Sequence, residues 1–329
     1  ARRPPTVEDT RVDRVGILGQ LRRGRLRPNA GPRSDKPGRN INPVSRTHRQ
    51  GGSLFMEVTG SALVTGASRG IGRAVALELA RRGFHVLASM RNPADGESLS
   101  GEVIEGTGGL EVVGLDVTRP DPGVFPENLR VLVNNAGLDG PNFAVENTSL
   151  EQWRALFETN LFGLAEVTRL ALPRLRSHPG SVVCNVTSCS TLLPVPFFGV
   201  YRASKAAVSA LGESPRAELA PHGVRVLEVM PGAIATDMLA SSAPIPEAAQ
   251  HAAYRAQAEQ LGTTRAAAAA EPTPAPEAAR AIVEAILDDS SPLRVGCDPM
   301  GVGLLSAWRS QSDEELMAPM LASFAAKEI

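Results

Sequence analysis

Tyr201 and Lys205 stand four residues apart in the segment YRASK, a spacing that could support acid–base chemistry. In a helix, residues four apart lie on the same face, so the phenol and the ammonium group would be neighbours. A tyrosine with its ordinary pKa of about 10 is a poor acid or base near neutral pH, but a nearby positive charge favours the phenolate. Such a pair could exchange a proton with a substrate oxygen. The alternative is an exposed helical pair without a chemical role.

Residues 65–72 read TGASRGIG and lie between a short apolar run and an amphipathic segment. Glycines allow a backbone to turn sharply and approach a phosphate, while free N–H groups and the positive end of a helix dipole attract its charge. A strand, a glycine turn and a helix in this order therefore indicate a dinucleotide site. The alternative is a tight turn without a ligand, because a single glycine motif is a weak signal.

The spacing TGxxxGxG, followed later by YxxxK, resembles the short-chain dehydrogenase/reductase family. Four further segments match that family in chain order. They are NNAG at residues 134–137, Asn160 within a long helix, Asp116 at the end of the third expected strand, and PGAIAT at residues 231–236. The resemblance covers residues 58–238 closely and the C-terminal portion only in outline.

This resemblance implies four catalytic residues. Tyr201 would be the general acid or base, and Lys205 would lower its pKa and bond the nicotinamide ribose. Ser188, thirteen residues before the tyrosine, would donate a hydrogen bond to the substrate oxygen where charge develops. Asn160 would hold a water that connects Lys205 to solvent, unless it is a polar residue that only bends its helix.

The same resemblance implies a nicotinamide dinucleotide cofactor. Arg69 and Arg91 could pair with a 2′-phosphate, and positions 89 and 90 hold no acid that would bind a free 2′-hydroxyl. NADP(H) is therefore predicted in preference to NAD(H), unless both arginines are ordinary solvated side chains. The residues expected to contact the cofactor are Thr65, Gly66, Ser68, Arg69, Gly70, Ile71, Gly72, Arg91, Asp116, Val117, Asn135, Ala136, Gly137, Tyr201, Lys205, Pro231, Gly232, Ile234 and Thr236.

Apolar runs typical of strands alternate with amphipathic segments typical of helices, which predicts one α/β domain of the doubly wound Rossmann type. Strands are expected at residues 61–64, 84–89, 110–117, 129–135, 181–187, 224–230 and 293–296. Helices are expected at residues 74–82, 149–175, 277–287, around Tyr201 and Lys205, and after Ser312. The interval between the third and fourth strands is too short for a full crossover helix. Pro215 places the far end of the helix with Tyr201 in doubt.

Residues 1–55 hold 13 of the 34 lysines and arginines but only four of the 35 acidic residues, and they show no apolar periodicity. We expect a disordered basic extension ahead of a domain at residues 56–329. Because Met56 shortly precedes the first strand, the extension is interpreted as upstream sequence translated in frame, and as dispensable. The alternatives are a transit peptide and a nucleic-acid-binding arm, for which it lacks stacking aromatic residues other than Phe55.

Residues 236–276 are rich in alanine and proline and predict a surface loop, or a lid over the substrate. The three cysteines and five histidines lack metal-ligand spacing, so neither a disulfide framework nor a metal site is expected. No apolar run has the length of a membrane span. We therefore expect a cytoplasmic protein that binds a small molecule, without nucleic acid.

The function expected from these motifs is NADP(H)-dependent interconversion of a secondary alcohol and a ketone on a hydrophobic, steroid- or retinoid-like substrate. The segment SMRN at residues 89–92 and the extra length after Thr236 resemble the 17β-hydroxysteroid and retinol dehydrogenase branch of the family. The alternatives are a 3-oxoacyl thioester reductase and a catalytically silent dinucleotide sensor. By the same resemblance, the long helices around Asn160 and Tyr201 would pair in a homodimer or homotetramer.

Overall fold

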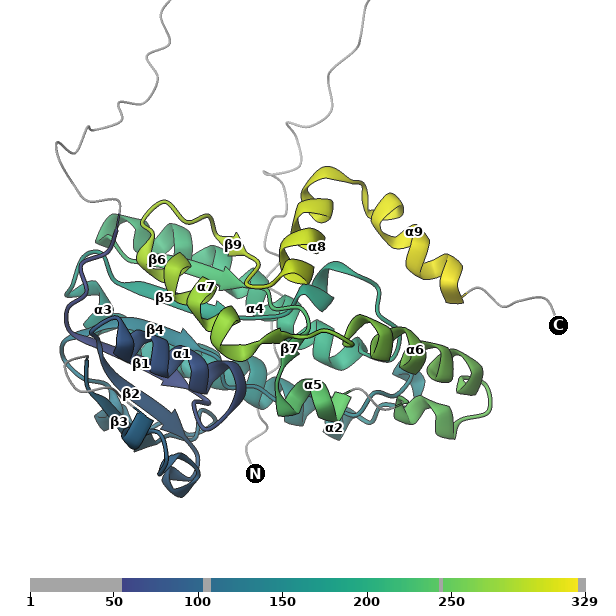
Figure 1. Ribbon diagram of the computed structural model, residues 1–329, viewed down its shortest axis with the longest axis horizontal. Helices are drawn as coiled ribbons and strands as arrows, with labels where there is room; N and C mark the ends of the chain where they lie inside the picture. Colours follow the sequence, from purple (N-terminus) through teal and green to yellow (C-terminus); the bar gives the residue numbers. More distant parts are fainter. Residues whose placement is uncertain (1–54, 103–107, 243–244, 325–329) are drawn as a thin grey trace, which may run out of the picture. The chain divides into compact units, whose positions relative to one another are not determined.

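The computed structural model describes residues 55–102, 108–242 and 245–324, and within them seven parallel strands form one sheet (Figure 1). The strands are β1 Ser61–Thr65, β2 His85–Met90, β3 Leu110–Gly114, β4 Leu129–Asn134, β5 Val182–Val186, β6 Arg225–Val229 and β9 Arg294–Val295. Their order across the sheet is β3-β2-β1-β4-β5-β6-β9. The predicted α/β fold is confirmed. The expectation for residues 1–55 lies outside the described residues, apart from Phe55.

The direction in which the chain adds strands reverses beside β1. This strand pairs with β2 on one side and with β4 on the other, both in parallel register. In doubly wound sheets, ligands bind at such a switch point, outside the carboxyl ends of the strands. The glycine turn, residues 65–72, follows β1 directly and therefore lies at this crevice.

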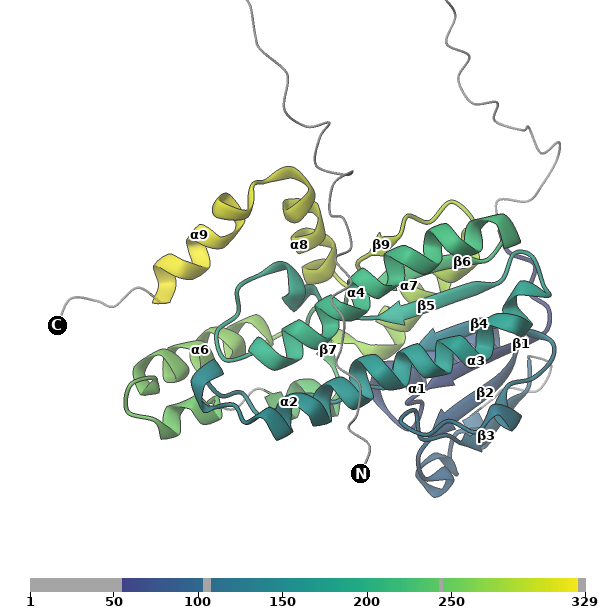
Figure 2. The same cartoon turned by 180° about the vertical axis from the view of Figure 1, so that it is seen from behind.

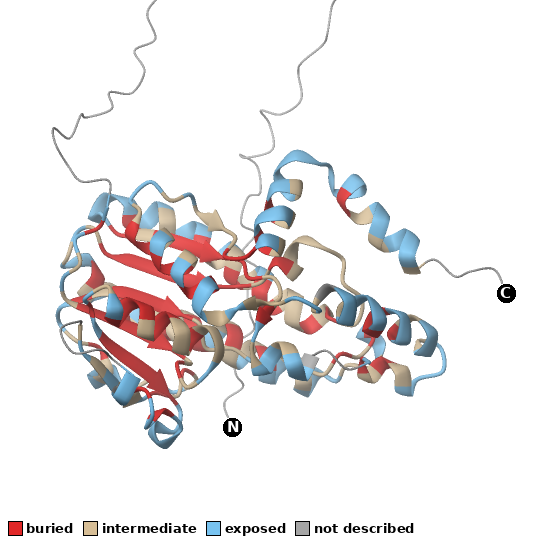
Figure 3. Cartoon of the chain, in the orientation of Figure 1, coloured by how far each residue is buried: buried red, intermediate tan, exposed pale blue. Residues whose placement is uncertain are grey.

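Helices cover both faces of the sheet. Helices α1 Gly70–Arg81 and α7 Ala275–Leu287 pack together on one face (Figure 1). Helices α3 Leu164–Arg176 and α4 Gly199–Leu219 contact β4 and β6 on the other face (Figure 2). The five central strands, β2, β1, β4, β5 and β6, are buried almost throughout (Figure 3), whereas the edge strands β3 and β9 are partly exposed. Burial on both faces explains why the strands read as continuous apolar runs in the sequence.

The long helix expected from Ser149 contains an irregular turn. Helix α2 Leu150–Phe157 begins at the predicted capping box, in which Ser149 accepts a hydrogen bond from the Gln152 backbone N–H and Gln152 bonds back. A π-helical segment, Glu158–Gly163, then separates α2 from α3. Helix α4 continues past Pro215 to Leu219, so the doubt about its far end was unfounded. Between β3 and β4 the described chain forms only a short 3₁₀ turn, as predicted.

Residues 236–276 differ most from the sequence prediction, because much of this segment is helical. It contains α5 Asp237–Ser242 and α6 Arg255–Ala268, and the short strands β7 Ile234–Ala235 and β8 Thr273–Pro274 pair at its two ends. Alanine favours helix strongly, but α6 carries too weak an apolar stripe to be recognised from its pattern. The sequence prediction also missed α8 Pro299–Ser310, whereas α9 Asp313–Phe324 follows the predicted cap at Ser312.

Short 3₁₀ turns complete the described structure, at Pro93–Gly96, Ser100–Glu102, Pro122–Val124, Val145–Asn147, Cys189–Leu192, Ala220–His222 and Glu247–Gln250. Among the helices of the described residues, none is both long enough and apolar enough to span a bilayer. The three thiols, Cys184, Cys189 and Cys297, are free and buried.

Candidate active site

The glycine turn after β1 has a backbone that only glycine accommodates readily. Gly66 and Gly70 have φ angles of 66° and 57°, in the left-handed region that other residues rarely adopt. A Cβ atom on Gly72 would lie 2.3 Å from Asn135 Nδ2 and 2.4 Å from the Gly66 carbonyl oxygen. The turn therefore packs directly against the end of β4, and Gly66 and Gly70 both line the pocket beside it.

Asn135 and Thr65 hold this turn in place. The Asn135 amide Nδ2 donates to the Thr65 carbonyl at 2.9 Å and to the Gly66 carbonyl at 3.1 Å. Thr65 Oγ1 accepts hydrogen bonds from the backbone N–H groups of Asn135 and Ala136, both at 3.0 Å. These four bonds tie the ends of β1 and β4 together, so part of the NNAG segment has a structural task.

Helix α4 carries Tyr201 and Lys205 beside the end of β5. The buried Lys205 Nζ donates a hydrogen bond to the Val186 carbonyl at 3.0 Å. The same nitrogen lies 6.0 Å from the centre of the Tyr201 ring. The phenol and the ammonium group are thus neighbours, as the spacing of four residues predicted.

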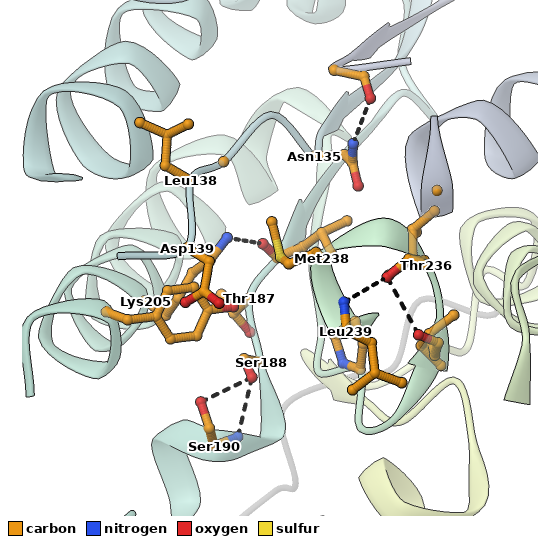
Figure 4. Close-up of a pocket in the computed structure, with 18 of the residues that line it drawn as sticks. Asn135, Leu138, Asp139, Thr187, Ser188, Ser190, Lys205, Thr236, Met238 and Leu239 are labelled. Atoms are coloured by element: carbon orange, nitrogen blue, oxygen red, sulfur yellow. Dashed lines mark hydrogen bonds between the residues drawn. The ribbon is translucent and has the colours of Figure 1, made fainter. Parts of the chain in front are cut away.

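Ser188 follows the end of β5 and lines the same pocket as Tyr201 and Lys205. Its Oγ lies 2.9 Å from Ser190 Oγ and accepts a hydrogen bond from the Ser190 backbone N–H at 3.2 Å (Figure 4). Its side chain also lowers the pKa of the Tyr201 phenol, and both side chains line the same pocket. Ser188 and Tyr201 therefore present two hydroxyl groups to the same point of the crevice.

Burial controls the protonation of the acid–base pair. It raises the pKa of Tyr201, the Asp139 carboxylate raises this pKa further, and the hydrogen bond with Ser188 acts in the opposite direction. Burial also lowers the pKa of Lys205 from its ordinary 10.5 to about 8. We expected Lys205 to lower the pKa of Tyr201. In the protein alone desolvation dominates instead, because both groups ionise in a poorly hydrated site.

Asn160 lies buried in the π-helical segment between α2 and α3. Its Nδ2 donates to the Leu138 carbonyl and to Ser204 Oγ, both at 3.0 Å, and its Oδ1 accepts from the Leu138 N–H at 2.8 Å. A Cβ atom on Gly137 would lie 3.3 Å from Lys205 Nζ and 3.4 Å from Asn160 Oδ1. Asn160 therefore holds the loop after β4 against α4, close to the lysine.

The residues expected at the adenosine end are set around the ends of β2 and β3. Asp116 Oδ1 accepts from the Thr118 N–H at 3.0 Å and from Thr118 Oγ1 at 2.8 Å, which lowers its pKa. Arg91 contributes a smaller lowering. Arg69 lies 3.9 Å from Asp237, with both side chains largely exposed. Arg69 and Arg91 are both exposed at the mouth of the pocket, where their guanidinium groups could bind an anion.

One pocket of about 810 Å³ connects these groups. It runs from the glycine turn along the carboxyl ends of the strands to Ser188, Tyr201 and Lys205. All the predicted site residues line it except Thr65, Gly72 and Asn160, which support it from behind. Within the described ranges, no group of three or more His, Cys, Asp or Glu residues is placed to hold a metal ion.

Comparison with known proteins identifies the family. The family model described as short chain dehydrogenase matches residues 61–245. The chain belongs to this family. It is 32% identical to a 3beta-hydroxysteroid dehydrogenase of Eggerthella lenta, over 57% of this chain and 76% of that one. It is 33% identical to a 3-oxoacyl-[acyl-carrier-protein] reductase of Staphylococcus aureus, over 56% and 78%.

A solved structure of a short-chain dehydrogenase from Burkholderia cenocepacia, in complex with NADP, is also similar. It shares 27% identity, aligns with a TM-score of 0.62, and the match covers 81% of this chain and 99% of that one. Short-chain dehydrogenases are oxidoreductases that use NAD or NADP. The residues present in this chain fit such a cofactor, because the left-handed glycines of the turn and the pocket beside it provide a phosphate cradle.

The end of the pocket beyond Tyr201, called the substrate half below, was anticipated only as a possible lid at residues 236–276, and sequence analysis named none of its individual residues. Its polar side chains include Asp139 after β4 and Arg265 on α6. Its apolar lining is Leu193, Val195, Phe198, Met238, Leu239, Leu261, Met300, Leu304 and Met320. Most of these residues come from segments without a motif, so no local signal could have found them. Asp298, the N-cap of α8, accepts a hydrogen bond from the Gly232 N–H at 2.7 Å and holds the turn after β6.

Proposed function

We propose that this short-chain dehydrogenase interconverts a secondary alcohol and a ketone with NADP(H). The observation that carries the proposal is that Ser188, Tyr201 and Lys205 line the same pocket as the glycine turn. When bound, the cofactor supplies the hydride for reduction or accepts it in oxidation. The three side chains supply what the hydride cannot, which is a proton source and stabilisation of charge on the substrate oxygen.

Tyr201 gives its proton to the carbonyl oxygen during reduction. Burial and Asp139 keep the phenol neutral, which is the form needed for a proton donor. Ser188 donates a hydrogen bond to the same oxygen as negative charge develops on it. Lys205, fixed on the Val186 carbonyl, favours the phenolate electrostatically once the proton has left. Asn160 supports Lys205 by holding the neighbouring loop, and by the family pattern a water at this place returns the proton.

NADP(H) is the cofactor that we propose over NAD(H). Arg69 and Arg91 line the pocket with exposed guanidinium groups, and Ser89 and Met90 provide no carboxylate at the end of β2. Guanidinium groups bind phosphates through charge-assisted hydrogen bonds. Asp95, Asp116 and Asp237 also line this end of the pocket, so the two arginines must outweigh three acidic neighbours. The similar structure bound to NADP supports the same assignment.

The apolar wall around Tyr201 supports a hydrophobic, steroid- or retinoid-like substrate. Leu193, Val195 and Phe198 precede the catalytic tyrosine, and Met300 and Leu304 of α8 complete the wall. The similarity to a 3beta-hydroxysteroid dehydrogenase agrees with such a substrate. A 3-oxoacyl thioester reductase is the second candidate, because a 3-oxoacyl reductase is equally similar to the chain. A panel of ketosteroids, retinal and an acetoacetyl thioester with NADPH separates the two.

Tyr201→Phe tests the mechanism, and the chain offers a matched control. We expect a loss of at least about a hundredfold in kcat, typical of removing a general acid, with NADPH binding nearly intact. The only other tyrosine, Tyr254, bonds Glu146 on the surface, so Tyr254→Phe should keep the wild-type rate. Near-normal turnover by Tyr201→Phe would rule the mechanism out. Unaltered kinetics in Tyr201→Phe, Lys205→Ala and Ser188→Ala alike would favour a silent dinucleotide sensor, with the turnover then due to a contaminant.

The proposal includes a homodimer or homotetramer. Phe162, in the π-helical segment before α3, leaves 55% of its surface exposed, and the neighbouring helices α3 and α4 are those that the family pattern pairs between subunits. Burying such an apolar side chain would favour association. Sedimentation velocity tests this point, and a monomer at assay concentration would contradict it.

A further inference from the structure

Arg265 of α6 lies in the substrate half of the pocket, and none of the described residues forms a hydrogen bond with its side chain. Its Nη1 atom is buried and lacks a partner among those residues. The guanidinium carbon lies 4.4 Å from the centre of the Phe198 ring, a distance suited to a cation–π contact. That contact satisfies the flat face of the group but none of its N–H donors. A buried donor of this kind is costly to leave unpaired.

The acidic groups of the site attract Arg265 without pairing with it. Asp139 and Glu247 both act on the guanidinium electrostatically, but within the described part of the chain no carboxylate lies within 4.0 Å of it. Glu247 Oε2 is engaged by the Asn142 backbone N–H at 2.9 Å, and Asp139 Oδ1 by the Gly140 N–H at 3.0 Å. Arg265 therefore keeps its N–H donors for another acceptor.

Arg294 shows how this fold treats a half-buried arginine that has a structural task. Its Nε donates to the buried Glu228 at 2.9 Å, and its Nη2 bonds Glu213 and Ser209. Its guanidinium also stacks on an aromatic ring, that of Trp308. Arg265 has the aromatic contact but lacks the carboxylates. Arg130, Arg174 and Arg225 also have a buried Nε without a hydrogen-bond partner, but each bonds another group through a second guanidinium nitrogen. Among the described residues Arg265 has no such bond, and the difference indicates a missing anionic partner.

Arg265 shares one aromatic wall with the catalytic tyrosine. The Arg265 guanidinium lies over the face of the Phe198 ring. The same ring packs edge-on against the Tyr201 ring, with the two centroids 6.4 Å apart. Asp139 acts electrostatically on both Tyr201 and Arg265. A single small molecule could therefore place a carbonyl at Tyr201 and a second group at Arg265.

We propose that Arg265 binds an anionic group, a carboxylate or a sulfonate, on the substrate, which is then a carbonyl compound with an apolar body and an anionic end. This inference rests on the proposed function, because it assumes that the reacting carbonyl lies at Tyr201. A guanidinium offers two parallel N–H donors to such an anion. The apolar lining accommodates the carbon chain between the two ends.

The test compares short keto acids with their methyl esters. With wild-type protein and NADPH, the keto acid should have a higher kcat/KM than its methyl ester in at least one acid–ester pair. Keto sulfonates, assayed in the same way, show whether the site prefers a sulfonate to a carboxylate. Arg265→Met should lower the acid-to-ester ratio about ten- to a hundredfold, the effect of losing a charged hydrogen bond. Arg265→Lys should keep part of the ratio. Arg280→Met, on the exposed face of α7 away from the pocket, should leave the ratio unchanged.

Thermal shift provides a readout that does not require turnover. The keto acid should raise the melting temperature of the wild type but not of Arg265→Met. If no carbonyl is reduced but this difference appears, the anion site stands and the proposed reaction fails. If ketones are reduced without any preference for the acid and the keto acid gives no shift, the anion site is wrong and the reaction stands. Equal losses for acid and ester in Arg265→Met would mean that Arg265 pairs with Asp139 as a structural group.

Discussion

Replacing Lys205 by methionine should make the protein more stable at neutral pH while abolishing its activity. Burial lowers the pKa of Lys205 from 10.5 to about 8, so the folded protein holds a charge that it solvates poorly. The difference corresponds to a destabilisation of roughly 3 kcal/mol when the lysine is fully charged. Methionine has a similar length but no charge. It leaves the Val186 carbonyl without its donor, which costs about 1 kcal/mol.

The pH dependence has a definite sign. Because the pKa of Lys205 is lower in the folded protein than in the unfolded chain, the unfolded chain binds more protons between about 8 and 10.5. The free energy of unfolding of the wild type should therefore rise with pH across this interval, relative to the variant. Below the interval the full destabilisation is present, and above it none remains. Tyr201 titrates in both proteins, so its contribution cancels in the difference.

Urea unfolding of the cofactor-free proteins at several pH values measures this difference. Near neutral pH, we expect the free energy of unfolding of Lys205→Met to exceed that of the wild type by about 2 kcal/mol. Above pH 10.5 this difference should disappear. Lys205→Arg is the control, because its guanidinium stays charged throughout the range. A constant difference between the wild type and Lys205→Met would show that burial does not depress the pKa of this lysine. Such a result would refute the electrostatic reasoning.

Three further outcomes are expected. Gly72→Ala should lower the free energy of unfolding by about 1–3 kcal/mol through overpacking and weaken NADPH binding, because its Cβ would overlap Asn135 and the turn. Gly303→Ala, in open space on α8, should instead stabilise the protein by about 0.5–1 kcal/mol, and urea unfolding that ranks the two alike would contradict this. Arg91→Ala should weaken NADPH binding about ten- to a hundredfold and NADH binding little, as fluorescence titration can check; equal losses would make Arg91 structural. Asp139→Asn should lower the pKa of Tyr201, because the carboxylate raises it. Carbonyl reduction should then decline at a lower pH than in the wild type. A pH–rate profile whose alkaline limb does not move would argue against this coupling.

Lys205 also illustrates why an active site can reduce stability. A well-hydrated lysine would keep its ordinary pKa and fold without the electrostatic cost, but it would lie too far from Tyr201 to act on its phenolate. Proteins commonly retain such unfavourable groups where chemistry requires them. The rest of the core, which is apolar on both faces of the sheet, supplies the compensating stability.

The sequence by itself determined the sheet, the glycine turn and the acid–base pair, because each depends on local rules. The strands of a parallel sheet are buried on both faces and read as apolar runs. The turn after β1 needs glycine at Gly66 and Gly70 for their φ angles. Tyr201 and Lys205 meet because they lie one helical turn apart.

The tertiary structure alone decided the substrate half of the pocket and the protonation of the site. Arg265, Phe198 and Asp139 come from three separate segments, and no periodicity within any segment records that they meet. Nor could the helices between residues 236 and 276 be recognised, because their alanine-rich sequence carries little contrast between faces. The upward pKa shift of Tyr201 depends on burial by distant residues, and desolvation is a property of the packed fold that residue spacing does not encode.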